Sequence, residues 1–217
     1  MGPVVTVSGS VGGIGASTFA FALALQAGLG AVLIDGCQGL PLDLLIGAEA
    51  RAGARWGQVR IRTADIEPDT VRAALPEHLG VRVLSTEAAA VPDAIAITHL
   101  VQALAKAPGA VVVDLPARDP LRSSLQPDLD VLLLPPTVHG VAAARMSVRS
   151  ATNPVVVRTG AADVAEEAIA GFIGVPIGHV VRWQRSVALA ATAGAPPPAQ
   201  SDVMMVAARL LGGLADA

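Results

Sequence analysis

The stretch Val7-Ser-Gly-Ser-Val-Gly-Gly-Ile-Gly-Ala-Ser-Thr18 decides how the rest of the chain is interpreted. The apolar run Val4–Val7 predicts a buried β-strand, and a helical pattern begins at Ser17 and Thr18, either of which can serve as the N-cap. The sequence therefore predicts a strand, a glycine-rich loop and a helix in succession. Such an arrangement places backbone N–H groups and a helix N-terminus around a phosphate group.

The loop lacks the positive charge that normally accompanies this geometry. A loop that hydrolyses nucleotides carries a lysine before its last Ser or Thr, because a cation neutralises phosphate charge. Ala16 occupies that position here. Two purely structural roles remain as alternatives: the glycines allow tight packing of strand against helix, and Asp114, at the end of a later strand, caps a helix.

Composition narrows the classes of function. The chain has 217 residues, of which 53% are hydrophobic and only 15% charged, against about 25% charged in an average domain. The net charge of −3 does not favour binding to nucleic acid or to anionic lipid. The single cysteine, Cys37, excludes a disulfide framework and fits a reducing cytoplasm. No apolar run is long enough to span a bilayer, and Met1-Gly-Pro-Val4 does not start like a signal peptide.

Apolar strand-like runs alternate with helical patterns along the whole chain. The predicted strands are Val4–Val7, Ala31–Ile34, Val81–Leu84, Ala110–Val113, Val131–Leu134, Val155–Val157 and Ile177–Val181. The predicted helices are Ser17–Gln26, Pro92–Lys106, Val138–Ser150, Asp163–Phe172 and Asp202–Leu214. Several runs are continuous, as in parallel strands buried on both faces. The sequence thus predicts one α/β domain over residues 1–217, with a doubly wound, mostly parallel sheet flanked by helices on both faces.

Ligands of such sheets bind at the carboxyl ends of the strands, where Gly9–Gly15, Asp35 and Asp114 all fall. The spacing Gly9-x-x-x-Gly13-Ile14-Gly15, with Asp35 about 20 residues later, matches the nucleotide loop of short-chain dehydrogenases. Those enzymes use a Tyr-x-x-x-Lys pair, whereas this chain has no tyrosine and its only lysine is Lys106. A non-catalytic dinucleotide-binding protein remains as an alternative.

A second resemblance covers more of the chain, from residue 4 to about residue 210. Ser10-Val-Gly-Gly-Ile-Gly-Ala-Ser-Thr18 resembles the deviant Walker A motif of the ParA/MinD family of partitioning and positioning ATPases. Ala31-Val-Leu-Ile-Asp-Gly36 resembles that family's second strand, and Val111-Val-Val-Asp-Leu-Pro116 its Walker B strand. Val175–Trp183, followed by Ala191–Pro196, is similar to the family's late strand and to the loop that flanks the base of the bound nucleotide.

Within that superfamily the chain resembles the CpaE/TadZ-like branch, which includes septum site-determining proteins encoded near pilus-type secretion genes. The similar pieces are Gly15-Ala-Ser-Thr18, Ala54-Arg-Trp56 and Val71–Pro76 followed by Val83–Ser85. Members usually carry an extra N-terminal receiver-like domain. Because the first predicted strand starts at residue 4, we expect a short member or an excised domain.

The resemblance implies roles for particular residues. Asp35 and Asp114 are expected to be catalytic, and Ser17 and Asp114 to hold Mg²⁺. The expected nucleotide-contacting residues are Gly12, Gly13, Ile14, Gly15, Ala16, Ser17, Thr18 and Arg158.

Departures from the family pattern weaken the expected activity. Val11 replaces the signature lysine that reaches across a dimer, and Ala16 replaces the lysine on the β- and γ-phosphates. Cys37 stands where a second acid often follows Asp35, and Arg158 where an asparagine commonly recognises adenine. A charge-assisted hydrogen bond contributes about 1.5–3 kcal/mol, so two lost lysines cost about 3–6 kcal/mol, or roughly two to four decades of affinity. We expect ATP or ADP with Mg²⁺ to bind weakly or not at all.

The sequence therefore predicts a degenerate ParA/MinD-type nucleotide-binding module in subcellular positioning, at the septum or a pilus or secretion machine, with weak or no ATP hydrolysis. One alternative is an active ATPase in which Arg118, Arg122 or Arg145 replaces the lost lysine. We expect a homodimer, or a partner from the division or pilus machinery. We further expect a cytoplasmic location, recruitment to septum or pole, and only indirect membrane association.

Overall fold

The computed structural model describes residues 1–37, 39–63, 65–86, 93–161 and 164–215. Its centre is a sheet with the strand order β3-β4-β2-β5-β1-β6-β7-β8. Every neighbouring pair is parallel except the edge pair of β3 and β4, which is antiparallel. The strands are β1 Val4–Gly9, β2 Val32–Asp35, β3 Glu77–His78, β4 Val81–Leu84, β5 Val111–Asp114, β6 Leu129–Leu134, β7 Val155–Thr159 and β8 Ile177–Val181.

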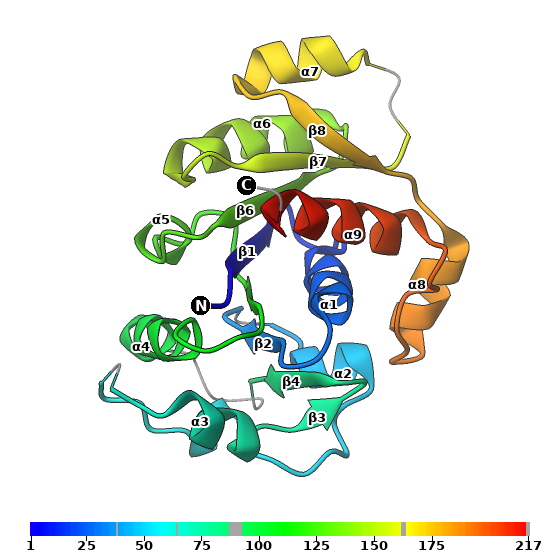
Figure 1. The fold of residues 1–217 in the computed structure, drawn as a ribbon. Helices are drawn as coiled ribbons and strands as arrows, with labels where there is room; N and C mark the ends of the chain where they lie inside the picture. Colours follow the sequence, from blue (N-terminus) through cyan, green and yellow to red (C-terminus); the bar gives the residue numbers. More distant parts are fainter. Residues whose placement is uncertain (38, 64, 87–92, 162–163, 216–217) are drawn as a thin grey trace.

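Helices cover both faces of this sheet (Figure 1). Their bounds are α1 Ala16–Ala27, α2 Leu42–Ile46, α3 Pro68–Ala74, α4 Ala94–Leu104, α5 Leu121–Ser124, α6 Val138–Ser147, α7 Glu166–Ile173, α8 Arg185–Thr192 and α9 Asp202–Ala215, with 3-10 turns η1 at Trp56–Gln58 and η2 at Val148–Ser150. One apolar core joins the sheet to α1, α2 and α9. Two further cores lie on the other face, one under α4 and one under α6 and α7. The predicted doubly wound fold is confirmed.

Helix α1 is the central element of its layer. It carries no charged residue, and its residues from Phe19 to Ala24 are all buried. An amphipathic stripe is not needed because α1 lies between the sheet and α9, so that apolar side chains are buried on more than one side. The N-terminus of α1 is therefore held firmly at the edge of the sheet where the glycine loop lies.

The beginning of α1 corrects the predicted N-cap. The helix begins at Ala16, and its N-cap is Gly15 in the left-handed conformation, with φ 95°. The Gly15 carbonyl accepts the hydrogen bond of the Phe19 N–H at 2.9 Å, which leaves Ser17 and Thr18 inside the first turn. Only glycine adopts this conformation without strain, and the glycine loop thus starts the helix without a side-chain cap.

All seven predicted strands and all five predicted helices are present, with boundaries shifted by a few residues. Pro92 and Asp163, the predicted starts of two helices, lie outside the described residues. The sequence did not predict α2, α3, α5, α8 or the two-residue strand β3. In the described part of the chain, no helix combines the length and the apolar character that crossing a membrane requires.

Candidate functional site

The strand register brings the predicted site segments to one edge of the sheet. Val7 of β1 pairs with Asp114 of β5, and Asp114 in turn pairs with Asp35 of β2. Because these strands are parallel, the segments that follow them leave at the same carboxyl edge. The glycine loop, Asp35 and Asp114 are thus brought together, as the sequence predicts.

The glycine loop is an open cradle. Gly13 and Gly15 have φ values of 74° and 95°, a backbone conformation that strains other residues. A Cβ added to Gly12, Gly13 or Gly15 would meet no atom within 4 Å, so the space in front of the loop is free. Tight packing therefore does not explain these three glycines. It does explain Gly9, where a Cβ would lie 2.5 Å from the Cγ2 atom of Ile14.

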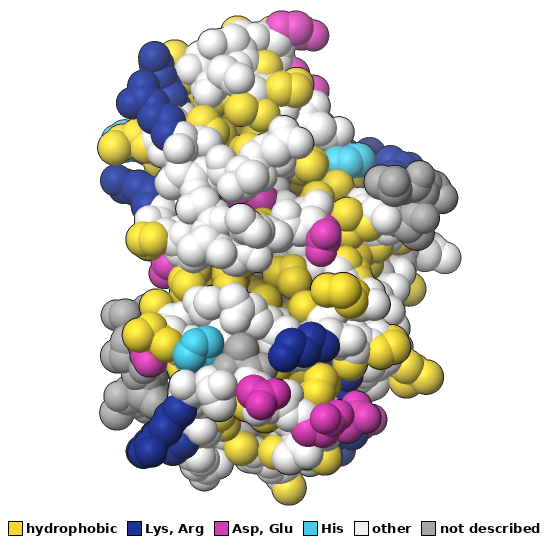
Figure 2. Space-filling model, turned by 60° about the vertical axis from the view of Figure 1, so that its left-hand side comes forward, with side chains coloured by type: hydrophobic (Ala, Val, Ile, Leu, Met, Phe, Trp, Pro, Cys, Tyr) yellow, Lys and Arg dark blue, Asp and Glu magenta, His cyan; other side chains and the backbone are white. Residues whose placement is uncertain are grey.

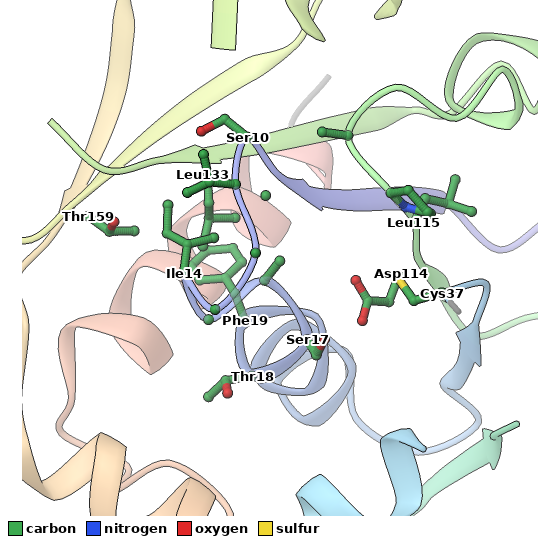
Figure 3. Close-up of a pocket in the computed structure, with 18 of the residues that line it drawn as sticks. Ser10, Ile14, Ser17, Thr18, Phe19, Cys37, Asp114, Leu115, Leu133 and Thr159 are labelled. Carbon is green, nitrogen blue, oxygen red and sulfur yellow. The ribbon is translucent and has the colours of Figure 1, made fainter. Parts of the chain in front are cut away.

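The loop forms one wall of a cavity of about 1340 Å³ (Figure 3). The other walls come from the segment after β2, the loop of residues 115–119 after β5, the turn Pro135–Pro136, and the residues around α8. Small-molecule pockets typically measure about 300–1000 Å³, so this cavity has room for a nucleotide. Much of its lining is apolar, including Leu40, Trp183 and Val187.

Asp114 lies deep in this cavity and is 2% exposed. Burial raises the pKa of its carboxyl to about 7, opposed by hydrogen bonds from the Ser17 and Cys37 side chains and reinforced by the negative charge of Asp35. Figure 3 shows the Asp114 carboxylate between Ser17 and Cys37. Its partners are side chains and not the N–H groups of a helix start, so Asp114 does not act as a helix cap.

Asp35 is equally buried, but its oxygens are already used by the fold. Its Oδ1 accepts the Cys37 N–H at 3.1 Å. Its Oδ2 accepts the Leu42 N–H at 3.2 Å, the Thr86 N–H at 3.3 Å and the Thr86 hydroxyl at 3.0 Å. Burial raises the pKa of Asp35, against these four hydrogen bonds. Asp35 thus ties the end of β2 to α2 and to the segment after β4.

Sequence comparison gives a relative but no family. No family model matches the chain. The chain is 38% identical, over 200 residues, to an uncharacterised protein of Mycobacterium tuberculosis, Rv3660c in strain H37Rv and MT3760 in strain CDC 1551. The match covers 86% of this chain and 56% of the relative, so the chain spans about half the length of the curated relatives it matches.

Solved structures identify the fold. The ParA family ATPase of Chlorobium tepidum superposes with a TM-score of 0.76 at 13% identity, covering 96% of this chain and 98% of that one. MinD in the MinC:MinD cell division complex of Aquifex aeolicus gives 0.75 at 17% identity, covering 97% and 96%. The chain has the ParA/MinD fold. A nucleotide-binding protein of Archaeoglobus fulgidus in complex with ADP also matches, with a TM-score of 0.58 at 16% identity over 93% and 90% of the two chains.

The two positions where the family resemblance implies lysines are Val11 and Ala16, and both line the cavity. The basic side chains of the described pocket lining are Arg118 and Arg182. Arg182 is paired with Asp202, through Nε–Oδ2 at 2.8 Å and Nη2–Oδ1 at 3.0 Å. Arg118 is exposed and forms no hydrogen bond or ion pair within the described residues.

The other two arginines considered as lysine substitutes lie away from the pocket. Arg122 is fully buried and pairs with both carboxylate oxygens of Asp130, at 2.9 and 3.0 Å. Arg145 lies over the ring of Phe172, with its Cζ atom 4.7 Å from the ring centroid. Neither arginine lines the cavity. The prediction that one of these two replaces the lysine is therefore wrong.

Arg158 is also turned away from the pocket. Its guanidinium pairs with Glu166 at 2.8 Å and donates to the carbonyl of Gly160. Thr159 and Gly160 line the cavity instead. Thr159 and Arg158 face opposite sides because successive side chains of a strand point to opposite faces. Figure 3 shows Thr159 on the side of the glycine loop away from Asp114. The structure thus places Thr159, which the sequence did not predict, where Arg158 was expected.

A divalent cation is the remaining implied group. The described residues contain no cluster of three or more His, Cys, Asp or Glu side chains that could hold a metal. Mg²⁺ does not need one, since it is usually held by one or two carboxylates together with substrate phosphates and water. The Asp114 carboxylate and the Ser17 hydroxyl provide two neighbouring oxygen atoms beside the open loop that could coordinate a metal ion. The residues present therefore fit Mg²⁺ bound together with a nucleotide.

Proposed function

We propose that this chain is a ParA/MinD-type nucleotide-binding module that acts in subcellular positioning, at the division septum or at a pilus or secretion machine, and hydrolyses ATP slowly or not at all. The observation that carries the proposal is the open glycine cradle beside Ser17 and Asp114, in a pocket that lacks both lysines. The open loop supports phosphate binding, and the absence of both lysines supports slow hydrolysis.

Nucleotide binding is supported by the backbone. Residues Gly12–Thr18 line the pocket and include the start of α1. In other proteins, the backbone N–H groups of such a loop and helix start bind phosphate. A structural neighbour binds ADP. Ser17 and Asp114 would hold Mg²⁺, which supplies positive charge to the phosphates when bound. Ionised Asp114 is required for that role, and its raised pKa makes the role dependent on pH.

Slow ATP hydrolysis is expected because the pocket lacks the positive charge of two lysines. Phosphoryl transfer is accelerated chiefly by cations aimed at the charge that develops on the transferred group. Val11 and Ala16 provide none. The transition state therefore loses at least the roughly 3–6 kcal/mol that the bound nucleotide loses.

We further propose that this face is covered by a second copy of the chain or by a protein of the division or pilus machinery. Leu40 and Trp183, both at the cavity, are 72% and 71% exposed. Exposed apolar side chains of this size at one site favour a protein partner. Figure 2 shows hydrophobic side chains in scattered patches over one face of the molecule, with charged ones in small separate groups. Recruitment to septum or pole from the cytoplasm would then depend on the partner, without direct membrane or nucleic-acid binding.

An arginine-assisted ATPase is the second candidate, favoured by the presence of Arg118 in the pocket. A dinucleotide-binding protein has less support. In that fold the strand bearing the ribose-binding acid neighbours the glycine-loop strand. Here β5 separates β2 from β1, and the Asp35 carboxylate already accepts four hydrogen bonds.

Calorimetric titration with ATP, ADP and NAD, with and without Mg²⁺, combined with a hydrolysis assay on the same sample, tests the proposal. We expect weak binding of ATP and ADP, no binding of NAD, and hydrolysis at background. Robust Mg²⁺-dependent hydrolysis that is lost in Asp114→Ala would support the active ATPase instead. Binding of NAD alone would support the dinucleotide-binding protein.

A further inference from the structure

The loop of residues 115–119 lines the same cavity as the glycine loop. Both loops leave neighbouring parallel strands at the same edge, since Val7 of β1 pairs with Asp114 of β5. The Leu115 N–H continues this contact by donating to the Val7 carbonyl at 2.9 Å. A long side chain on this loop therefore has access to the same space as the loop that cradles phosphate.

The loop is also fastened to the protein interior. The buried guanidinium of Arg122 donates to the Ala117 carbonyl at 2.7 Å, while its other nitrogens hold Asp130. On the far side, the Asp119 carboxylate accepts the Leu121 N–H at 2.9 Å. Residue 118 thus has an anchored neighbour on each side, so its backbone is held in place before any ligand binds.

Among the residues of this loop, all of which line the pocket, Arg118 is the basic one. It is exposed, lines the cavity, and makes no hydrogen bond or ion pair among the described residues. The second basic residue of the lining, Arg182, already has its charge matched by Asp202. The five N–H donors of Arg118 therefore remain available to an incoming anion.

We propose that Arg118 contacts the phosphate groups of a bound nucleotide and supplies the positive charge that Val11 and Ala16 do not. The inference rests on the proposed nucleotide-binding function. A guanidinium fork matches phosphate oxygens in a bidentate geometry, and anchoring of the loop lowers the entropy lost on binding. Arg118 acts here on affinity, with no claim on the rate of hydrolysis.

The test compares the binding of ATP and of adenosine by titration calorimetry in wild type, Arg118→Ala and Arg149→Ala. Arg149 is exposed, lies outside the cavity lining, and is the matched control because its removal changes the net charge equally. We expect Arg118→Ala to weaken ATP binding about 10- to 100-fold, the effect of one charge-assisted hydrogen bond, and to leave adenosine binding unchanged. Arg149→Ala should alter neither. Adding Ala16→Lys to Arg118→Ala should restore ATP affinity, because a lysine at the loop replaces the lost cation.

The outcomes separate the two proposals. Equal ATP affinity in wild type and Arg118→Ala would overturn the role of Arg118 while leaving nucleotide binding intact. Equal weakening of ATP and adenosine would also overturn it, since a phosphate contact cannot affect adenosine. Absence of any ATP or ADP binding to wild-type protein would overturn the proposed function and this inference together. An unchanged unfolding midpoint in each variant shows that the fold is retained.

Discussion

The ion pair between Arg122 and Asp130 gives the sharpest prediction about stability. Both side chains are 0% exposed, and the guanidinium also donates to the carbonyls of Ala117 and Ser147. Arg122→Met keeps the length of the side chain but leaves the Asp130 carboxylate buried without its cation, with donors only from the Thr6 hydroxyl and the Thr152 backbone among the described residues. Breaking a buried pair in this way costs about 3–5 kcal/mol. A chain of this size loses about 2–4 °C of Tm per kcal/mol, so Tm should fall by about 6–20 °C.

Urea denaturation followed by circular dichroism measures this cost. Arg149→Met is the matched control, since Arg149 is exposed and its loss should change the unfolding free energy by no more than about 0.5 kcal/mol. The double variant Arg122→Met with Asp130→Leu should regain much of the loss, because no unpaired charge remains buried. A cost of about 1 kcal/mol or less for Arg122→Met, or a double variant no more stable than the single one, would refute the reasoning.

Three further predictions concern the pocket. Ala16→Lys with Val11→Lys should increase ATP affinity at least about 10-fold by calorimetry, because the glycine cradle is open; unchanged binding in a folded variant would show that the loop is blocked. The folded-state pKa of Asp114, about 7, lies above its ordinary value of 3.8, so the folded state binds more protons and its stability falls as pH rises through this window. Asp114→Asn should therefore gain stability over wild type at pH 8 but not at pH 4, measured by urea denaturation without Mg²⁺; an equal difference at both pH values would contradict the shift. Sedimentation velocity should show a dimer with or without ATP and Mg²⁺, since Val11 cannot couple nucleotide to an interface; a dimer seen only with nucleotide would contradict this prediction.

The sequence predicts the sheet well because its central strands β1, β2, β5 and β6 are buried on both faces and form largely apolar runs. It misses α2 and α5, which have five and four residues and are too short to show a helical period. It also misses β3, whose two residues form a strand only through pairing with β4. These elements depend on tertiary contacts that no local pattern records.

The candidate site is predicted in part for a similar reason. The glycine loop, Asp35 and Asp114 could be placed because the carboxyl ends of parallel strands meet at one edge. The direction in which long side chains point could not be predicted from the sequence. Arg122 pairs with Asp130 and Arg158 with Glu166, in each case eight residues further along the chain. The sequence pattern does not reveal ion pairs at this separation. The two-residue period of β7 does indicate that Arg158 and Thr159 face opposite sides.

A single-turnover experiment, with the protein in excess over ATP at saturating Mg²⁺, tests the central claim most directly. One filtration step reports how much ATP is bound, and the phosphate released from the same sample reports how much is cleaved. The account predicts that wild-type protein retains ATP. It also predicts that the retained ATP is hydrolysed no faster than ATP in a control without protein. Rapid release of phosphate that disappears in Asp114→Ala, or no retention of ATP at any protein concentration, would contradict it.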